Sequence, residues 1–203
     1  MALGSRPLFP IRRRYRFFQS PEIAGPHRWE GILLKTVLLL RHAKSSWDQP
    51  GLPDPLRPLA PRGQKAAPRI GAYMARSRIL PDLVYCSTAR RARATWDLVS
   101  GKLEHQTDVE VREDLYHASP GSLIELIKEL PDSIGTVLLV GHNPTFEDLA
   151  LALTGGGDEE GLREMAFKYP TGALAVIDFS IERWCEVRAG EGVLRTFVKP
   201  RAL

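Results

Sequence analysis

Two histidines of the sequence stand directly after short apolar segments that have the composition of buried strands. His42 follows the segment 36–40, with Arg41 between them, and His142 follows the segment 136–140 with one residue between them. The carboxyl ends of parallel strands meet at one edge of a sheet. The two histidines are therefore predicted to lie close together, although they are 100 positions apart in the chain.

A third apolar segment, 83–86, leads into a basic cluster that contains Arg90, Arg91 and Arg93. Guanidinium groups can donate two parallel hydrogen bonds to phosphate oxygens. A neutral imidazole nitrogen can attack phosphorus when its other nitrogen is held by a hydrogen bond, and a second, protonated imidazole can add positive charge. The three strand ends therefore predict a site for a phosphoryl group that needs no metal ion or other cofactor.

The rest of the chain supplies the elements that position these groups. Helical patterns alternate with apolar strands, which predicts an α/β fold with three layers: a mainly parallel central sheet with helices on both faces. Pro68 is expected to kink the first helix unless it falls in the first turn. The expected helices span 62–77, 89–103, 120–130 and 145–153, and the expected apolar strands span 36–40, 83–86, 136–140 and 172–179.

The C-terminal part of the chain has a different pattern. The segments 173–180, 184–188 and 193–198, joined by polar turns, predict antiparallel strands at an edge of the sheet. The glycine run 155–157 lacks the lysine and the hydroxyl residue of a phosphate-binding loop, and it is predicted to be a flexible turn.

The positive charge of the chain is concentrated at its N-terminal end. Of the formal net charge of +4, residues 1–35 carry +5 and residues 36–203 carry −1. We expect 1–35 to be a basic, flexible arm and 36–203 to form one folded domain. We interpret the arm as a disordered extension, or as the result of a translation start assigned too far upstream. The alternative is that the arm makes an electrostatic contact with nucleic acid or a membrane. The domain itself has no general attraction for polyanions, so neither is expected as an obligatory partner.

Two cysteines, Cys86 and Cys185, stand in contexts typical of strands. This small number argues against a disulfide framework and against a cysteine-ligated zinc site, and it suits a reducing compartment. The sequence contains no apolar run near the roughly 18 residues that a membrane span requires, and no secretory signal pattern. We expect a cytoplasmic monomer.

The motifs at the strand ends resemble those of the histidine phosphatase superfamily, which implies a phosphoglycerate mutase-like fold. The motifs that carry this resemblance are Arg41-His42, Ser87…Arg91-Ala92…Thr95 and Val140-Gly141-His142-Asn143. Three further segments are similar to the short SixA-type branch, the phosphohistidine phosphatases: Arg41-His42-Ala43-Lys44-Ser45-Ser46-Trp47, Asp54-Pro55-Leu56-Arg57-Pro58-Leu59 and Lys168-Tyr169-Pro170-Thr171-Gly172. The resemblance covers about 36–203. Ala43 replaces the usual glycine of the superfamily, and we interpret it as a mark of the branch.

The resemblance implies a role for each matching residue. His42 would be the nucleophile that carries the phosphoryl group. Arg41 and Arg91 would clamp the phosphate, His142 would be the second, hydrogen-bonding histidine, and Arg57 would lie near the phosphate.

The source of the proton for the leaving group is less well defined. Asp54 matches an acidic position of the loop after the first strand and is the candidate for proton transfer. Glu113 or Asp114 could serve instead. Phosphohistidine has a nitrogen leaving group that is readily protonated, so a dedicated acid is not required.

The expected function is therefore hydrolysis of phosphohistidine on a protein, by way of a phosphohistidine intermediate on His42. A site of this kind would also hold an inorganic phosphate-like anion. Within the enzymes, the alternative is a phosphatase or mutase that acts on a small phosphate ester. Mutases of this superfamily carry long insertions over the substrate, and the 168 residues from Thr36 onward leave no room for one. Outside the enzymes, the alternative is a non-catalytic binding module that uses the basic arm.

Overall fold

A computed structural model describes residues 28–29 and 32–203 of the chain. A seven-stranded mixed sheet forms its centre, with strand order β5-β4-β6-β3-β8-β9-β7. The strands of this sheet are β3 (Lys35–Arg41), β4 (Leu83–Ser87), β5 (Asp108–Arg112), β6 (Thr136–Gly141), β7 (Thr154–Gly157), β8 (Leu174–Phe179) and β9 (Gly192–Val198), and a two-stranded antiparallel sheet of β1 (Arg28–Trp29) and β2 (Ile32–Leu33) precedes them. The helices are α1 (Pro61–Arg76), α2 (Arg90–Ser100), α3 (Pro120–Lys128), α4 (Thr145–Leu153) and α5 (Glu159–Phe167), with 3₁₀ helices η1 (Asp54–Leu56), η2 (Asp114–Tyr116) and η3 (Trp184–Glu186).

The strand directions divide the sheet into two parts. Strands β5, β4, β6 and β3 run parallel, β8 is antiparallel to β3, and β9 is antiparallel to β8. Strand β7 closes the other edge, parallel to β9. The predicted α/β fold is confirmed, with a mostly parallel sheet and antiparallel strands from the C-terminal part of the chain.

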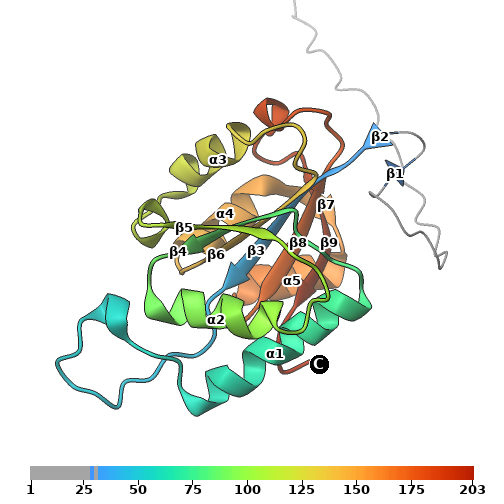
Figure 1. Ribbon diagram of the computed structural model, residues 1–203. Coiled ribbons are helices and arrows are strands. Elements are labelled where there is room, and N and C mark those ends of the chain that lie inside the picture. Colours follow the sequence, from blue (N-terminus) through green and yellow to red (C-terminus); the bar gives the residue numbers. More distant parts are fainter. Residues whose placement is uncertain (1–27, 30–31) are drawn as a thin grey trace, which may run out of the picture.

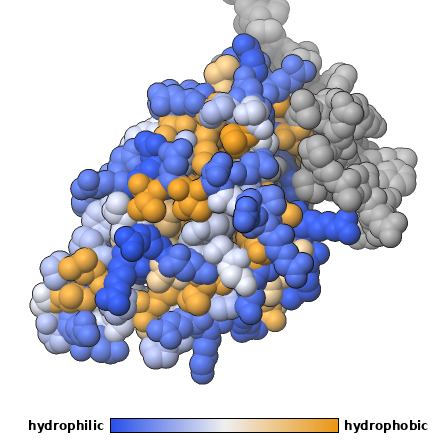
Figure 2. All heavy atoms as spheres, viewed as in Figure 1, coloured by the Kyte–Doolittle hydropathy of each residue, from blue (hydrophilic) through white to orange (hydrophobic). Residues whose placement is uncertain are grey.

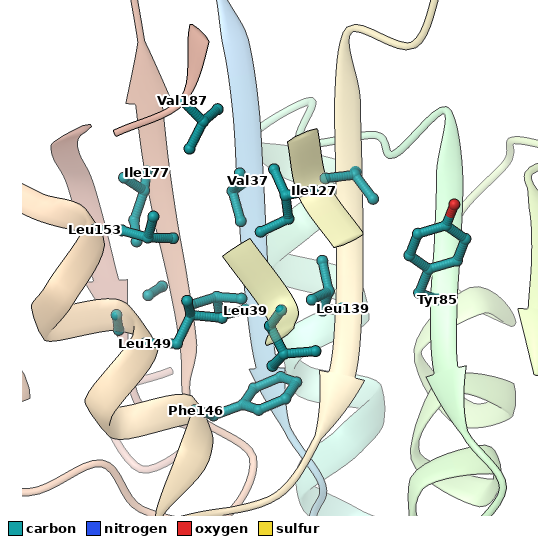
Figure 3. Close-up of a cluster of buried hydrophobic side chains, with 14 of the residues drawn as sticks. Val37, Leu39, Tyr85, Ile127, Leu139, Phe146, Leu149, Leu153, Ile177 and Val187 are labelled. Carbon is teal, nitrogen blue, oxygen red and sulfur yellow. The ribbon is translucent and has the colours of Figure 1, made fainter. Parts of the chain in front are cut away.

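Helices cover both faces of the sheet (Figure 1), and the alternation of side chains along each central strand explains why. In β3, Leu38 and Leu40 are buried against α1 and α2, whereas Val37 and Leu39 are buried against α3, α4 and α5. Figure 3 shows the second cluster, in which Phe146 of α4 lies near the carboxyl ends of β3 and β6. Strands buried on both faces must be apolar throughout, and this is the pattern of the sequence.

The four apolar strands and the four helices expected from the sequence are present close to their predicted bounds. Helix α1 continues through Pro68, which lies beyond its first turn. The N-terminal arm proposed for 1–35 falls largely outside the described residues and stays a prediction. Within the described residues, no helix is long and apolar enough to cross a lipid bilayer.

The prediction of a strand at 184–188 is wrong. Residues 184–186 form η3 instead. The indole of Trp184 is fully buried, its Nε1 donates to the Ile134 carbonyl oxygen at 2.8 Å, and its backbone N–H donates to Asp132 at 3.1 Å. These contacts hold residues 184–186 against the loop that precedes β6. Cys185 is therefore an exposed residue of η3 and not of a strand, whereas Cys86 lies in strand β4 as predicted and is buried.

The flexible turn predicted for the glycine run is also wrong, because Gly155–Gly157 belong to strand β7. A Cβ atom on Gly155 would overlap the Gly190 carbonyl oxygen, and one on Gly157 would overlap the backbone of Leu194 in β9. The glycines allow close backbone approach, which is a known use of glycine in strands.

Strand β5 and helix α5 are also absent from the elements expected from the sequence. Strand β5 is an exposed edge strand, in which Val109 and Val111 are 43% and 52% exposed, and Figure 2 shows apolar residues over this strand. Helix α5 has the acidic first turn, Glu159 and Glu160, that favours a helix N-terminus.

Candidate active site

The sheet register brings the two predicted histidines together. Strands β3 and β6 are parallel neighbours (Figure 1), and Arg41 and Gly141 are Cα partners at their carboxyl ends. The backbone N–H of His42 donates to the Gly141 carbonyl oxygen at 2.9 Å. As a result, the rings of His42 and His142 lie with their centroids 5.1 Å apart.

Arg91, in the first turn of α2, lies between the two rings. Its Nε donates to His42 Nε2 at 3.2 Å, and its Nη2 lies 3.4 Å from His142 Nδ1. The side chain is 8% exposed. The neighbours Arg90 and Arg93 are exposed. The structure therefore brings together His42, His142 and Arg91, as the strand-end argument predicts.

The hydrogen bonds of His42 define its tautomer. Nδ1 lies 2.7 Å from the Ala43 carbonyl oxygen, which can only accept, so Nδ1 carries the hydrogen. Nε2 is therefore unprotonated, and its lone pair accepts from Arg91 Nε at 3.2 Å. Burial lowers the pKa of His42 to about 3, and the nearby charges of Arg91 and Arg41 act in the same direction. At neutral pH the ring is uncharged, and Nε2 can act as a nucleophile once the hydrogen bond from Arg91 is released.

His142 has a similar environment. Its Nε2 lies 2.9 Å from the Ser87 hydroxyl of β4. Since a guanidinium can only donate, Nδ1 accepts from Arg91 and Nε2 donates to Ser87. Burial and the charge of Arg91 lower the pKa of His142 to about 4. The protonated second imidazole expected from the sequence is therefore disfavoured in this arrangement, and His142 is a neutral hydrogen-bonding group.

Arg41, the last residue of β3, is held by the loop that precedes β8. Its Nη1 donates to the Tyr169 carbonyl oxygen at 2.5 Å, and the same oxygen accepts from Asn143 Nδ2 at 3.2 Å. Asn143 is itself held by Glu147 of α4, at 2.8 Å. The Nε of Arg41 is buried and has no acceptor among residues 28–29 and 32–203. Asn143 and Tyr169 were quoted from the sequence as parts of motifs, but their contact with Arg41 was not predicted.

Thr95 of α2 connects the backbone that follows His42 to Arg91. Its Oγ1 accepts from the Ala43 N–H at 2.9 Å and donates to the Arg91 carbonyl oxygen at 2.6 Å. The residue is fully buried. Thr95 thus positions the backbone after His42 against the helix that carries Arg91.

Asp54, in η1, lies against two arginines. Its Oδ1 accepts from Arg57 Nη1 at 2.7 Å, its Oδ2 pairs with Arg91 Nη2 at 2.8 Å, and its backbone oxygen accepts from Arg91 Nη1 at 2.7 Å. The Tyr116 hydroxyl donates to Oδ2 at 2.5 Å. Burial alone would raise the pKa of Asp54, but the hydrogen bonds from Tyr116, Arg57 and Arg91 outweigh it and hold the pKa below its usual range. The carboxylate is ionised at neutral pH.

Arg57 reaches the site only through Asp54. Its Nε donates to the Ser46 carbonyl oxygen at 3.0 Å and its Nη2 to Ser45 Oγ at 2.9 Å. The indole of Trp47 stacks on the guanidinium, 3.1 Å from ring centroid to Cζ. No contact joins Arg57 to His42 within the described residues.

The other acidic candidates lie apart from these contacts. Asp114 pairs with Arg112 of β5 at 2.7 Å, on the exposed edge of the sheet. Glu113 is exposed. Tyr116, by contrast, was not predicted as a site residue. Its ring lies 5.2 Å from that of His142, edge to face. No spacing in the sequence indicates this contact, because Tyr116 follows an exposed edge strand.

The comparisons with known proteins identify the family of the chain. Residues 37–135 match the model of the histidine phosphatase superfamily, branch 1. An uncharacterized protein of Mycobacterium tuberculosis is 38% identical over 167 residues, which are 80% of this chain and 100% of that protein. The chain belongs to the histidine phosphatase superfamily, branch 1.

Two solved structures of proteins named SixA are also similar. The structure of a candidate phosphohistidine phosphatase SixA of Agrobacterium tumefaciens has 32% sequence identity and a TM-score of 0.70, over 82% of this chain and 98% of that chain. A protein histidine phosphatase SixA, solved in complex with tungstate, has 20% identity and a TM-score of 0.67, again over 82% and 98% of the two chains. The second comparison shows the shared fold alone.

Proposed function

We propose that the protein is a phosphatase that removes the phosphoryl group from phosphohistidine on a protein substrate, by way of a phosphohistidine intermediate on His42. The observation that carries the proposal is the placement of a neutral, lone-pair-bearing Nε2 of His42 against the guanidinium of Arg91, with His142 at 5.1 Å. A nucleophile beside fixed positive charge is the arrangement that phosphoryl transfer requires.

In the first step, the hydrogen bond that Arg91 Nε–H donates to His42 Nε2 is replaced by one to an oxygen of the incoming phosphoryl group, which frees the lone pair of Nε2. That lone pair attacks phosphorus, and the bond from phosphorus to the substrate nitrogen breaks. The leaving imidazole takes up a proton. In the second step, water attacks phosphorus, the bond to Nε2 breaks, and inorganic phosphate and neutral His42 are formed. Arg91 and Arg41 stabilise the charge on the phosphoryl oxygens. These guanidinium groups provide the positive charge, so the scheme uses no metal ion.

Arg41 supports this assignment in a second way. A buried N–H without an acceptor is energetically costly, and an oxygen of a bound phosphoryl group would satisfy the Nε of Arg41. Arg57 stays a predicted substrate contact that would act after a change in its pairing with Asp54. Asp54 as proton donor also stays a prediction, and its low pKa opposes that role at neutral pH.

Several features favour a protein substrate over a small ester. The solved structure at 32% identity is that of a candidate phosphohistidine phosphatase SixA. The exposed indole of Trp47, 72% accessible, borders the loop that carries Asp54. In addition, the part of the chain that the structure describes has no long insertion over the site. We further propose that the protein acts in the cytoplasm as a monomer. Residues 36–203 carry a net charge of only −1, so neither nucleic acid nor a membrane is expected as an obligatory partner.

The test compares substrates. Purified protein is incubated with a phosphohistidine peptide and with a panel of sugar phosphates, and released phosphate is measured. We expect release from the peptide, lost in His42→Ala and kept in His105→Ala, which changes an exposed histidine outside the site. Activity only on the sugar phosphates would favour the small-ester alternative. Unimpaired turnover by His42→Ala would contradict the mechanism.

A further inference from the structure

Asp54 occupies hydrogen-bond donors that a phosphoryl group would need. Its carboxylate accepts from Arg57 through Oδ1 and pairs with Arg91 through Oδ2. Its backbone oxygen takes the remaining Nη of Arg91. An arginine holds a phosphoryl group with the same fork of N–H donors. A phosphoryl group at the histidines and the Asp54 carboxylate therefore require the same face of Arg91.

The geometry makes this competition direct. The Nη2 of Arg91 that pairs with Asp54 at 2.8 Å is also the atom 3.4 Å from His142 Nδ1. An oxygen of a phosphoryl group bound at His42 and His142 would approach that Nη2, where it would meet the Asp54 carboxylate. Two anions at one donor repel each other, so one of them must leave.

Asp54 is able to leave because it stands in a solvent-accessible position. Its side chain is 46% exposed, whereas that of Arg91 is 8% exposed. The residue begins the short helix η1, in the long loop between β3 and α1. Movement of the carboxylate into water would expose a charge that is readily hydrated, while Arg91 stays in place.

Tyr116 opposes that movement. Its hydroxyl donates to Asp54 Oδ2 at 2.5 Å, and its ring packs edge to face on His142 with 5.2 Å between centroids. Tyr116 thus links the carboxylate to a histidine of the site from an element, η2, that is remote in the chain.

We propose that the Asp54 carboxylate competes with the phosphoryl group for Arg91, and that the Tyr116 hydroxyl holds Asp54 in the competing position. The inference rests on the anion site of the proposed function and gives Asp54 a role other than proton transfer. Its consequence is weak retention of free inorganic phosphate, because Asp54 returns to Arg91 when the product leaves.

The test measures the dissociation constants of tungstate and of inorganic phosphate by titration calorimetry, at neutral pH and low salt. Asp54→Asn keeps the shape of the side chain and removes its charge. We expect both anions to bind about tenfold more tightly, the effect of one charge-assisted hydrogen bond that no longer has to be broken. Asp48→Asn is the matched control, because Asp48 lies in the same loop and contacts only Ser46 among the described residues. It should leave binding unchanged.

Tyr116→Phe separates competition from a general change in charge. This variant alters no charge, so long-range attraction for the anion stays the same, but it removes the hydrogen bond that holds Asp54. We expect anion binding to tighten, by less than in Asp54→Asn. Circular dichroism melting would establish that each variant is folded.

The outcomes distinguish the inference from the proposed function. Equal or weaker binding in Asp54→Asn, or unchanged binding in Tyr116→Phe, with the wild-type chain binding tungstate, would overturn the competition while leaving the phosphatase site intact. Failure of the wild-type chain and of every variant to bind either anion would overturn the anion site itself, and the inference with it.

Discussion

The charge states of the two site histidines follow from where their strands end. Both rings are buried at the carboxyl edge of the sheet beside Arg91, and both environments penalise a positive charge. The sequence indicates that His42 and His142 meet, because buried parallel strands end at one edge. It does not indicate their pKa values, which depend on packing from helices elsewhere in the chain.

A histidine titration tests these charge states. We expect neither His42 nor His142 to take up a proton between about pH 7 and about pH 5, since their pKa values are lowered from 6.5 to about 3 and about 4. Ring signals in NMR spectra, assigned with His42→Asn and His142→Asn, would report this. A midpoint close to 6.5 for either ring would contradict the burial argument.

The same shifts have a consequence for stability. The histidines of the unfolded chain take up protons below about pH 6.5, whereas the folded rings stay neutral down to about 4 and about 3. The unfolded state therefore binds more protons in this window. The free energy of unfolding should fall as the pH is lowered through it, and urea unfolding at several pH values would measure the slope.

Arg91 cannot be replaced by lysine on this account. Its three nitrogens hold three positions at once, on His42, His142 and Asp54, and a single ammonium cannot reproduce that planar fork. Arg91→Lys should lower kcat/KM by about 100-fold or more. Arg93→Lys, an exposed position of the same helix, should leave it unchanged. Similar kcat/KM values for the two variants would argue against the clamp.

The sequence did not predict contacts between residues of two loops that are distant in the chain. Asp54 was identified by motif, but its hydrogen bond to Tyr116, 62 positions away, was not. The residues around Tyr116 contain no pattern that identifies it as a site residue. Only the path of β5 and η2 along the edge of the sheet brings its hydroxyl to the loop after β3.

At the scale of elements, the conformation of the loop between β3 and α1 depends on a close approach between the backbone of that loop and helix α1. The Ala60 N–H donates to the Lys44 carbonyl oxygen at 2.8 Å, and Ser45 bridges to Leu59. A Cβ atom on Gly63, in the first turn of α1, would overlap that same Lys44 oxygen. The glycine therefore allows the helix to close the loop that carries Asp54 and Arg57.

Gly63→Ala should lower the free energy of unfolding by about 1 to 3 kcal/mol, because a methyl group is forced against backbone. Turnover should also fall, since the loop must shift. Gly121→Ala in α3 is the control, where the nearest atom to the added Cβ is Ser119 Oγ at 3.9 Å. Denaturant unfolding of both variants would show the difference, and equal stabilities would contradict the packing argument.

The elements that the sequence predicted are those buried on both faces or amphipathic over several turns. Of the elements that it missed, β5 and β7 lie at the edges of the sheet, helix α5 packs against β9 and β7, and η3 is a short 3₁₀ helix. Strand β5 is mostly exposed and short, β7 consists largely of glycine, and η3 is fixed by the contacts of one buried tryptophan. The periodicity of apolar residues predicts secondary structure poorly where a single partner strand or a single buried side chain determines the conformation.

For the molecule as a whole, the core and the site groups that the structure describes lie within residues 35–203. The excess positive charge lies before them in the chain. Removal of residues 1–27 should therefore leave the melting temperature and the turnover of phosphohistidine peptide unchanged. Parallel measurements on the full and shortened chains would test this. A loss of turnover would show that the arm takes part in the reaction, and salt-dependent nucleic-acid binding lost with the arm would assign it a separate role.

The central claim is that the phosphoryl group passes through His42. The most direct measurement is mass spectrometry of the protein after brief reaction with a phosphoramidate donor, with digestion at alkaline pH to preserve phosphohistidine. We expect the phosphoryl group on the peptide that contains His42 and no labelling of that peptide in His42→Ala. A label on His142 or on another residue, or turnover without any labelled intermediate in wild-type protein quenched during reaction, would contradict the account.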